Sequence, residues 1–299
     1  MKILLFGKGG QLGWELQRSL APLGELVALD FDSTELCGDF TNPSGLAETV
    51  RTVRPDVIVN AAAHTAVDKA QSEPELVRTI NALAPAVLAQ QAAALGAWLV
   101  HYSTDYVFDG SGERPWREHD ATGPLNIYGL TKLEGEQAIA LSAAKHLVFR
   151  TSWVYAARGG NFAKTMLRLA KERERLSVIN DQLGAPTGAE LLADVTAHAL
   201  RQVTGGVDGA SLAGLYHLSA SGHTTWHGYA SLVLETALKL GVALKASPAT
   251  IDPVTTAAFP TPAQRPLNSR LDTTKLQRTF NLVLPPWQLG VVRMLTETL

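Results

Sequence analysis

The sequence predicts an α/β protein built on a Rossmann-type, doubly wound parallel sheet, together with a smaller mixed α/β lobe. Three observations carry this prediction. Short apolar runs alternate with helical patterns through about residue 150. A glycine-rich turn follows the first apolar run directly. After residue 150 the elements are fewer, shorter and less regular. We therefore expect a nucleotide-binding domain over 1–150 and a mainly substrate-binding lobe over 151–299, with some of its segments returning to the first domain.

The composition is typical of a globular protein of one large or two smaller domains. The chain has 299 residues, of which 46% are hydrophobic. Its formal net charge of −2 provides no basic field for a nucleic acid or an anionic membrane. The single cysteine, Cys37, is consistent with a reducing compartment. Only a short apolar run follows Lys2, and no run approaches the roughly 18 residues of a membrane span. We expect a soluble, cytoplasmic protein without a signal peptide.

The chain begins with an expected strand, a glycine turn and a helix. An apolar run over 3–6 is followed by glycines at positions 7, 10 and 13, and then by an amphipathic pattern. Glycines at this spacing suit a tight turn, close approach of the backbone to a pyrophosphate, and close helix packing. The second apolar run, over 26–29, ends at Asp30, where an acid can accept hydrogen bonds from an adenine ribose. A capping aspartate is the alternative, and Asp32 competes for the role.

Two further buried strands are expected at 55–60 and 98–102, after helical patterns over 44–53 and 85–95. The first runs into Ala61-Ala62-Ala63-His64-Thr65, and small residues at the carboxyl end of a strand let a ligand lie against the backbone. We interpret His64 as a loop histidine beside that ligand. The second strand ends in Ser103 and Thr104, whose hydroxyls are placed to hydrogen-bond a substrate oxygen, although a turn could equally employ them.

Tyr128 and Lys132 lie four residues apart at the expected start of a helix, so they share one helix face. A positive charge about 4 Å from a phenol is worth roughly 4 kcal/mol at an effective dielectric near 20. That interaction would bring the phenol pKa toward neutrality, where a proton donor works best. A surface tyrosine beside a solvated lysine is the alternative, because this spacing is common. In the predicted sheet the glycine turn, Ala62, Thr104 and Tyr128 converge on one crevice.

The region after residue 150 carries fewer candidates for chemistry. A helix is expected over 161–171 and another near 225–240, and a proline-rich stretch covers about 260–272. Arg265 and Arg270 lie in that stiffened stretch, where two guanidinium groups suit a diphosphate. Ordinary exposed charge is the alternative.

A series of motifs in chain order resembles the extended short-chain dehydrogenases and, within them, the dTDP-4-dehydrorhamnose reductase family. The motifs lie at 7–13, 60–68, 103–110, 128–132, 150–155, 181–187 and 265–269. The resemblance implies reduction of the 4-keto group of dTDP-4-dehydro-β-L-rhamnose to dTDP-β-L-rhamnose with NADPH or NADH. This would be the last step in making an activated sugar for cell-surface polysaccharide.

The resemblance also implies site residues. Tyr128 would protonate the developing C4 alkoxide, Thr104 would hold the same oxygen, and Lys132 would lower the phenol pKa and bind the nicotinamide ribose. The expected cofactor contacts are Gly7, Gly10, Gln11, Leu12, Gly13, Asp30, Asp39, Phe40, Ala62, Ala63, Thr65, Tyr102, Tyr128 and Lys132. The expected substrate contacts are Thr104, Asp105, Tyr128, Trp153 and Arg265.

Some relatives look like magnesium-bridged homodimers, with glutamates at positions matching Glu15 and Glu190 and a further acid near the C-terminus. In this chain the tail over 291–299 has its only acid at Glu297, so two surface carboxylates without Mg²⁺ are the alternative. The cofactor choice is also open. Asp30 and Asp32 would repel a 2′-phosphate and so favour NADH, whereas the family looks tolerant of NADH and NADPH.

Two rival functions stay open. The first is reduction of a different dTDP-4-keto-6-deoxy sugar, because variable loops of the second lobe would set that choice. The second is a non-catalytic role, because the NADP-binding regulatory subunit of methionine adenosyltransferase resembles the same family. The intact set of Thr104, Tyr128 and Lys132 argues against this second possibility.

Overall fold

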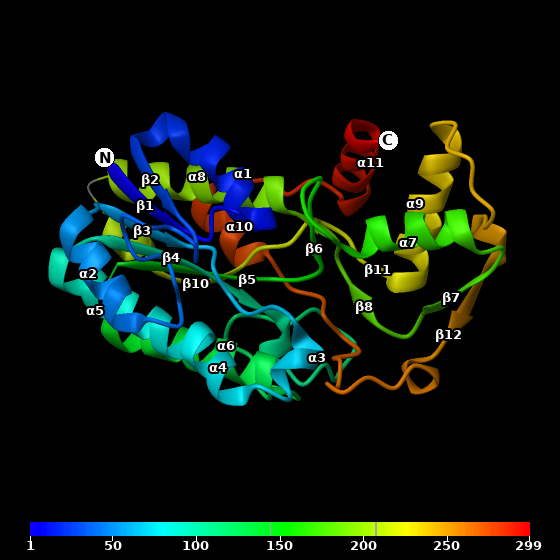
Figure 1. Cartoon of the computed structure of the whole chain (residues 1–299), viewed down its shortest axis with the longest axis horizontal. Helices are drawn as coiled ribbons and strands as arrows, with labels where there is room; N and C mark the ends of the chain where they lie inside the picture. The colour runs from blue at the N-terminus through cyan, green and yellow to red at the C-terminus, as the bar shows by residue number, and fades with distance from the viewer. Residues whose placement is uncertain (144, 207) are drawn as a thin grey trace.

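The computed structural model describes residues 1–143, 145–206 and 208–299. Its centre is a six-stranded sheet in the order β10-β5-β4-β3-β1-β2, and every strand pairing in it is parallel (Figure 1). The strands are β1 (Lys2–Phe6), β2 (Glu25–Leu29), β3 (Val57–Asn60), β4 (Trp98–Thr104), β5 (His146–Thr151) and β10 (Gly214–His217). The chain moves from β1 outward to β2 and then returns to β3 on the other side of β1. This reversal opens a crevice at the carboxyl ends of the strands.

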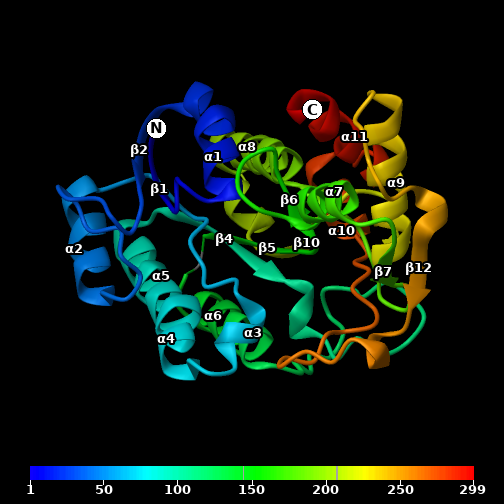
Figure 2. The ribbon, with the colours of Figure 1, turned by 45° about the vertical axis from the view of Figure 1, so that its right-hand side comes forward.

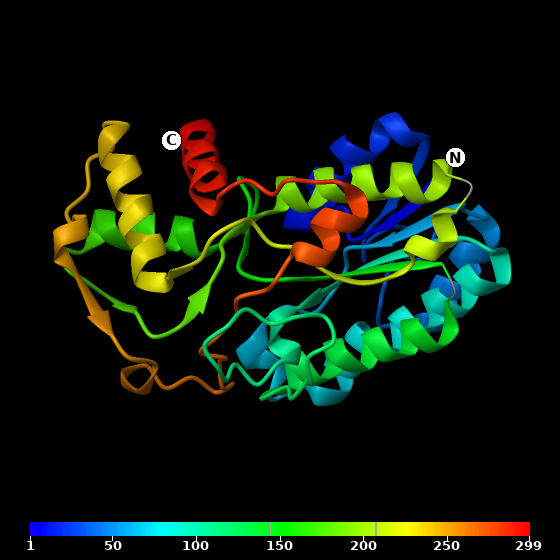
Figure 3. The same ribbon diagram turned by 180° about the vertical axis from the view of Figure 1, so that it is seen from behind.

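Helices cover both faces of the sheet, because successive side chains of a buried strand point to opposite faces. On one face, Ile3 and Leu5 of β1 pack in a core with α1 (Gln11–Leu20), α8 (Ala189–Gly205) and α10 (Thr274–Phe280). On the other face, Leu4 and Phe6 pack in a core with α2 (Pro43–Val53), α5 (Ala84–Leu95) and α6 (Ile127–Ser142). Figure 3, the view from behind, shows α8 and α10 against one face of the sheet. The predicted α/β class with a doubly wound parallel sheet is therefore confirmed.

A second lobe lies beyond the carboxyl ends of the strands and has a core of its own (Figures 1 and 2). Its helices are α7 (Phe162–Glu172), α9 (Trp226–Lys239) and α11 (Trp287–Thr298). Three small two-stranded sheets join them, formed by β6 (Val154–Tyr155) with β9 (Thr187–Gly188), β7 (Leu176–Ile179) with β12 (Ile251–Val254), and β8 (Leu183–Gly184) with β11 (Thr224–Thr225). The segments after residue 150 that lie on the large sheet are α8, β10 and α10.

Short helices complete the first lobe between β3 and α5. They are α3 (Val67–Ala70), α4 (Pro74–Arg78) and a π-helical stretch, Thr79–Leu83, which runs directly into α5. Irregular helical turns of this kind often accompany functional sites. Within the described ranges, no helix is both long and apolar enough to cross a membrane.

Candidate active site

The glycine turn holds the start of α1 against the loop that follows β3. Gly7 has φ +83°, and a Cβ on it would lie 2.7 Å from the backbone nitrogen of Ala62. A Cβ on Gly13 would lie 1.9 Å from the Gly7 carbonyl oxygen, so only glycine permits this close packing. Gly10 is the N-cap of α1, and among the described residues no side chain caps this helix. The N–H groups that open α1 are therefore free to bind an anion.

The residues that begin α1 have different environments. Gln11 is half-buried, and its Oε1 accepts a hydrogen bond from Asn161 Nδ2 at 3.3 Å, which joins the turn to the second lobe. Leu12 packs its side chain against the core beneath α1. Its contribution to a cofactor would therefore come from its backbone.

Asp30 fixes the far side of the turn. Its Oδ2 accepts from the Gly9 backbone N–H at 2.7 Å, and its Oδ1 accepts from the Phe31 N–H at 2.9 Å. Asp32 is exposed. Of the two aspartates, Asp30 is thus the one built into the turn.

Asp39 and Phe40 follow β2 but differ in exposure. The Asp39 carboxylate accepts from the Thr41 backbone N–H and hydroxyl, each at 2.8 Å. Phe40 is buried edge-to-face against Phe6, with ring centroids 5.6 Å apart. Phe40 therefore shapes the floor beneath the site, whereas Asp39 remains partly accessible.

The loop after β3 is held by two asparagines. Ala62 donates its backbone N–H to Asn60 Oδ1 at 3.0 Å. The backbone of His64 is clamped on both sides by Asn81, through its N–H at 2.9 Å and its carbonyl at 3.1 Å. Ala63 lies half-buried between these anchors, and the neighbouring Thr65 is exposed. The loop can therefore present its backbone to a ligand without moving.

Tyr128 reaches the crevice because α6 starts close to the end of β4. Asn126 caps α6, accepting from the Gly129 N–H at 2.9 Å. This approach requires glycine at position 129, because a Cβ there would lie 2.1 Å from the Tyr106 carbonyl oxygen. The phenol of Tyr128 lies beside the Thr104 hydroxyl. The structure thus brings together these two residues, as the sequence predicted.

The prediction that Lys132 lowers the pKa of the Tyr128 phenol is wrong. Burial raises the pKa of Tyr128 to about 12, with the charge of Asp105 adding to the rise and the hydrogen bond to Thr104 opposing it. Lys132 does not contribute, because its ammonium group is directed elsewhere. The spacing of four residues fixes a shared helix face, but it does not fix where a long side chain ends.

Lys132 is buried, with an exposed fraction of 2%, and its Nζ is directed at β4. Nζ donates to the Tyr102 carbonyl oxygen at 2.6 Å and lies 3.1 Å from His101 Nε2. Burial lowers the pKa of Lys132 to about 8, and the charge of Glu136 opposes this shift. The amine is therefore poised to gain or lose a proton near neutral pH.

Tyr102 contributes its carbonyl, and not its phenol, to this side of the sheet. Its hydroxyl lies 2.7 Å from Thr196 Oγ1 on α8, and its ring packs beside Phe149. Successive strand residues alternate between faces, so His101 faces α6 while Tyr102 faces α8. The predicted contact of Tyr102 with the cofactor would therefore come from its backbone and not from its side chain.

Asp105 follows Thr104 and is 2% exposed. It accepts a hydrogen bond from the Thr104 hydroxyl at 3.2 Å. Burial raises the pKa of Asp105 to about 7, while hydrogen bonds from Ser269 and Thr104 lower it. Its Oδ2 has no partner within the described part of the chain. A buried carboxyl oxygen without a partner suits a ligand hydroxyl.

A cavity of about 260 Å³ lies between the lobes next to these groups. Its lining is mainly aromatic and apolar, with some uncharged polar side chains and Arg265, and includes Tyr106, Phe162, Met166, Trp226 and Phe259. Tyr106 connects it to the catalytic side, because its ring meets the Tyr128 ring at 5.6 Å. Arg265 donates to Asp68 at 2.8 Å, which orients the guanidinium. Flat rings beside an arginine suit a nucleobase with a phosphate.

Trp153 stands beside this cavity in a constrained position. Its backbone has φ +48°, and its ring stacks on Trp226 with centroids 3.6 Å apart. A Cβ on Gly184 would lie 2.4 Å from Trp153 Cε2, so the glycine of the 181–187 motif makes room for the indole. Residues far apart in the sequence therefore fix one aromatic wall.

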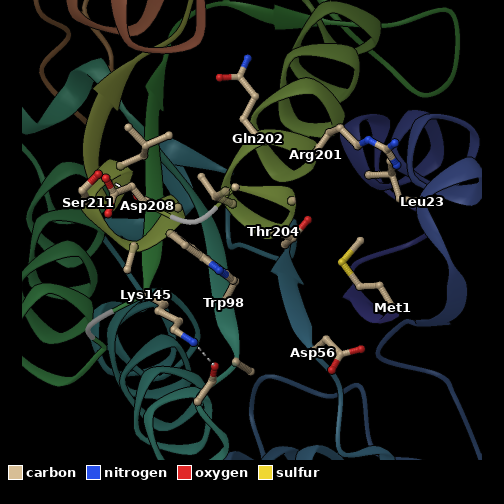
Figure 4. A pocket seen from close by; sticks show the side chains of 18 of the residues that line it. Met1, Leu23, Asp56, Trp98, Lys145, Arg201, Gln202, Thr204, Asp208 and Ser211 are labelled. Carbon is tan, nitrogen blue, oxygen red and sulfur yellow. Dashed lines mark hydrogen bonds between the residues drawn. The ribbon is translucent and has the colours of Figure 1, made fainter.

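A wider hollow lies at the opposite end of the sheet (Figure 4). Its lining includes Asp56, which precedes β3, and Trp98, which begins β4. Open α/β sheets bind ligands at the carboxyl ends of their strands. The hollow of Figure 4 is therefore not a candidate for the active site.

Glu15 and Glu190 share a third hollow with Glu297, at the meeting of α1, α8 and α11. Glu15 pairs with Arg18 at 3.3 Å, and Glu297 pairs with Arg293 at 3.0 Å. Burial raises the pKa of Glu190. Over the described ranges, no group of three or more His, Cys, Asp or Glu side chains could hold a metal ion. Glu15 and Glu297 are each paired with an arginine, so the described residues do not form a magnesium site within one chain.

Comparison with known proteins places this site in a family. The family model for the RmlD substrate binding domain matches residues 1–299. The dTDP-4-dehydrorhamnose reductases of Salmonella typhimurium LT2 and Escherichia coli K12 are each 65% identical to this chain over 297 residues, covering 99% of it and 98% of each relative. The chain belongs to the dTDP-4-dehydrorhamnose reductase family.

A solved member of this family has the same fold. The crystal structure of the dTDP-4-dehydrorhamnose reductase of Bacillus anthracis, in complex with NADP, is 35% identical to this chain. It matches with a TM-score of 0.89 and covers 99% of both chains. The family resemblance that the sequence motifs indicated is confirmed.

Several residues of the site could not be recognised in the sequence. His101 lies inside an apolar strand, where a single polar residue gives no functional signal, whereas Asn60 ends β3 and was indicated only as the first residue of the motif at 60–68. Glu136 and Arg150 form a buried ion pair of 2.6 Å one turn beyond Lys132. The spacing of four residues between Lys132 and Glu136 could have indicated that Glu136 lies near the site, since buried charges need partners.

Proposed function

We propose that this chain catalyses the NAD(P)H-dependent reduction of the C4 keto group of dTDP-4-dehydro-β-L-rhamnose, giving dTDP-β-L-rhamnose. This is the last step of dTDP-rhamnose formation. Full-length relatives of that name support the assignment at 65% identity. The structural observation that carries it is the placement of the Tyr128 phenol beside Thr104 at the carboxyl end of β4, with the buried Lys132 on the next turn of α6.

Tyr128 acts as the general acid. NAD(P)H, when bound, supplies the hydride that C4 receives. The Tyr128 hydroxyl donates its proton to the C4 oxygen as negative charge develops there, and the Thr104 hydroxyl donates a hydrogen bond to the same oxygen. With a pKa of about 12, the phenol is fully protonated near neutral pH and ready to donate. A protonated Lys132 then stabilises the phenolate that remains.

The first lobe holds the cofactor in this proposal. The free N–H groups at the start of α1 bind the pyrophosphate, and the backbone of Ala62 and Ala63 borders it. Asp30 accepts hydrogen bonds from the adenosine ribose. Its negative charge favours NADH over NADPH, while both remain substrates. The ratio of kcat/KM values for the two cofactors tests this preference.

The second lobe holds most of the sugar nucleotide. Arg265 binds the diphosphate, and the aromatic cavity beside it receives the nucleobase. Trp153 and Asp105 contact the sugar ring, the former by packing and the latter by accepting a hydroxyl hydrogen. This division assigns the cofactor to residues 1–150 and the diphosphate and nucleobase mainly to residues 151–299, while Thr104, Asp105 and Tyr128 of the first lobe contact the sugar.

A magnesium-bridged homodimer is a separate proposal that comes from the family resemblance. The acids Glu15 and Glu190 would need carboxylates from a second copy to complete a cation site. Magnesium would then act on assembly and not on the reaction. Light scattering with Mg²⁺ and with a chelator tests this, since a dimer that persists in the chelator would remove the metal from the proposal.

The reductase assignment is tested with purified protein and a panel of dTDP-4-keto-6-deoxy sugars that differ at C3 or C5. The proposal predicts the highest kcat/KM for dTDP-4-dehydro-β-L-rhamnose. A higher value for another sugar would assign the chain to a different reduction. Absence of turnover with every sugar would favour a non-catalytic role.

A further inference from the structure

His101 is a buried imidazole for which the reaction described above has no role. It lies on β4 with an exposed fraction of 1% and is in register with Asn60 on β3. Its Nδ1 is 3.0 Å from Asn60 Nδ2, and its Nε2 is 3.1 Å from Lys132 Nζ. The imidazole therefore connects the base of the cofactor loop to the catalytic lysine.

Ala62 fixes the orientation of the Asn60 amide. Asn60 Oδ1 accepts the Ala62 N–H at 3.0 Å, so the NH₂ end of the amide faces His101. An amide nitrogen donates and does not accept, so Nδ1 of the imidazole must be the acceptor. In a neutral imidazole the hydrogen then lies on Nε2. Burial holds the pKa of His101 well below its usual value, so the ring is neutral.

The hydrogen on Nε2 is directed at Lys132 Nζ. An ammonium group has three donors and no acceptor, so it cannot receive this bond. A neutral amine can, because its lone pair accepts from Nε2–H while one of its own hydrogens goes to the Tyr102 carbonyl. The polar arrangement around Lys132 therefore favours the neutral amine.

The charged and titratable groups near Lys132 come from three elements. Glu136 is on α6, one turn beyond the lysine, and its charge favours the ammonium. That carboxylate is held at 2.6 Å by Arg150 of β5, which reduces its effect. Tyr128 of α6 is an uncharged phenol at neutral pH, and His101 is the group that β4 presents.

We propose that Asn60 and His101 form an oriented pair of hydrogen bonds that favours the neutral amine of Lys132 and so lowers its proton affinity, which makes His101 a positioning residue for the lysine. Protonation of Lys132 breaks the bond from Nε2–H, whereas the bond from Nζ to the Tyr102 carbonyl can remain. The positive charge that stabilises a Tyr128 phenolate then arises as His101 loses its hydrogen bond to the lysine. This catalytic consequence rests on the proposed reductase function, whereas the hydrogen-bond arrangement does not.

The tautomer of His101 can be measured directly. In protein labelled with ¹⁵N-histidine, we expect His101 to carry its hydrogen on Nε2 at about pH 9, above the pKa of about 8 of Lys132. The His101→Gln variant assigns the resonance by its loss. A hydrogen on Nδ1, or a protonated ring, would overturn the proposal. This wild-type measurement decides the matter even where a variant does not fold.

Asn60→Asp is the matched perturbation, because it replaces the amide by a carboxylate of the same shape. The carboxylate can accept from both the Ala62 N–H and an Nδ1–H. We expect the hydrogen of His101 to move to Nδ1, leaving Nε2 as an acceptor for an ammonium at Lys132. An unchanged tautomer in this variant would contradict the argument.

The kinetic consequence separates positioning from ordinary structural support. In Asn60→Asp, Lys132 should bind its proton about tenfold more tightly or better. The alkaline limb of the pH profile of kcat should therefore move up by about one pH unit or more. The KM for the sugar nucleotide should stay within about threefold of wild type, since neither Asn60 nor His101 is a proposed contact of the sugar nucleotide. His198→Gln, on the exposed face of α8, is the control and should leave the profile unchanged.

A uniform loss of kcat in Asn60→Asp without movement of the limb would indicate structural support alone and overturn the positioning role. If the wild type itself shows no turnover, the reductase function fails while the tautomer measurement still decides the hydrogen-bond proposal.

Discussion

Replacing Tyr128 by phenylalanine removes the proposed proton donor while retaining the ring that packs edge-to-face on Tyr106. A positioned general acid contributes about 10²- to 10⁴-fold to the rate, which corresponds to roughly 3–5 kcal/mol of transition-state stabilisation. The contact of the hydroxyl with Thr104 is also lost, at about 1 kcal/mol of folding stability. The variant should therefore fold, bind cofactor and turn over at least about a hundredfold more slowly.

The assay is the initial rate of cofactor oxidation at saturating sugar, combined with a fluorescence titration of cofactor binding. Tyr216→Phe is the matched control. Tyr216 is on β10, away from the crevice, and its hydroxyl donates to the Leu212 carbonyl at 2.7 Å. It should lose similar stability and retain turnover. If Tyr128→Phe keeps a turnover within about threefold of wild type, Tyr128 is not the general acid.

Three further predictions concern the buried charges and the aromatic wall. Asp105→Asn should stabilise the protein at pH 8 by up to roughly 4 kcal/mol, because the pKa of Asp105 is raised by burial from 3.8 to about 7. The stability contribution of Asp105 is complete below its unfolded pKa and is lost as the pH rises through about 7, so the gain should vanish toward pH 4; urea unfolding across this range measures it. Glu136→Gln should cost about 3–5 kcal/mol because it leaves the Arg150 guanidinium buried without its counter-ion, and an unchanged urea midpoint would contradict that reasoning. Gly184→Ala should displace the Trp153 indole. The KM for the sugar nucleotide should rise by about tenfold, and kcat should fall by a smaller factor. An unaffected KM would remove Trp153 from the substrate site.

The sheet could be predicted from the sequence because its signals are local. Apolar runs of four to six residues, a glycine triad and helical spacing each depend on neighbours in the chain. The role of β10 as an edge strand beside β5 was not visible, because the run around Tyr216 resembles any short strand. Strand order depends on contacts between distant segments, and periodicity does not encode it.

The candidate site was predictable in its residue types but not in its hydrogen bonds. The spacing of Tyr128 and Lys132 gave the shared helix face. The direction of the lysine was set by His101 and the Tyr102 carbonyl on β4, which come from another part of the chain. The aromatic cavity needs Tyr106, Trp226 and Arg265 to converge from three separate segments. Such convergence follows from packing, and short motifs record only its separate parts.

The reductase function is tested most directly by following the absorbance of NADH or NADPH with purified dTDP-4-dehydro-β-L-rhamnose and identifying the product by NMR. We predict stoichiometric oxidation of the cofactor and formation of dTDP-β-L-rhamnose, at rates that fall with Tyr128→Phe and persist in Tyr216→Phe. Oxidation that yields a C4 epimer would contradict the proposed placement of the sugar. No oxidation with either cofactor would contradict the reductase function itself.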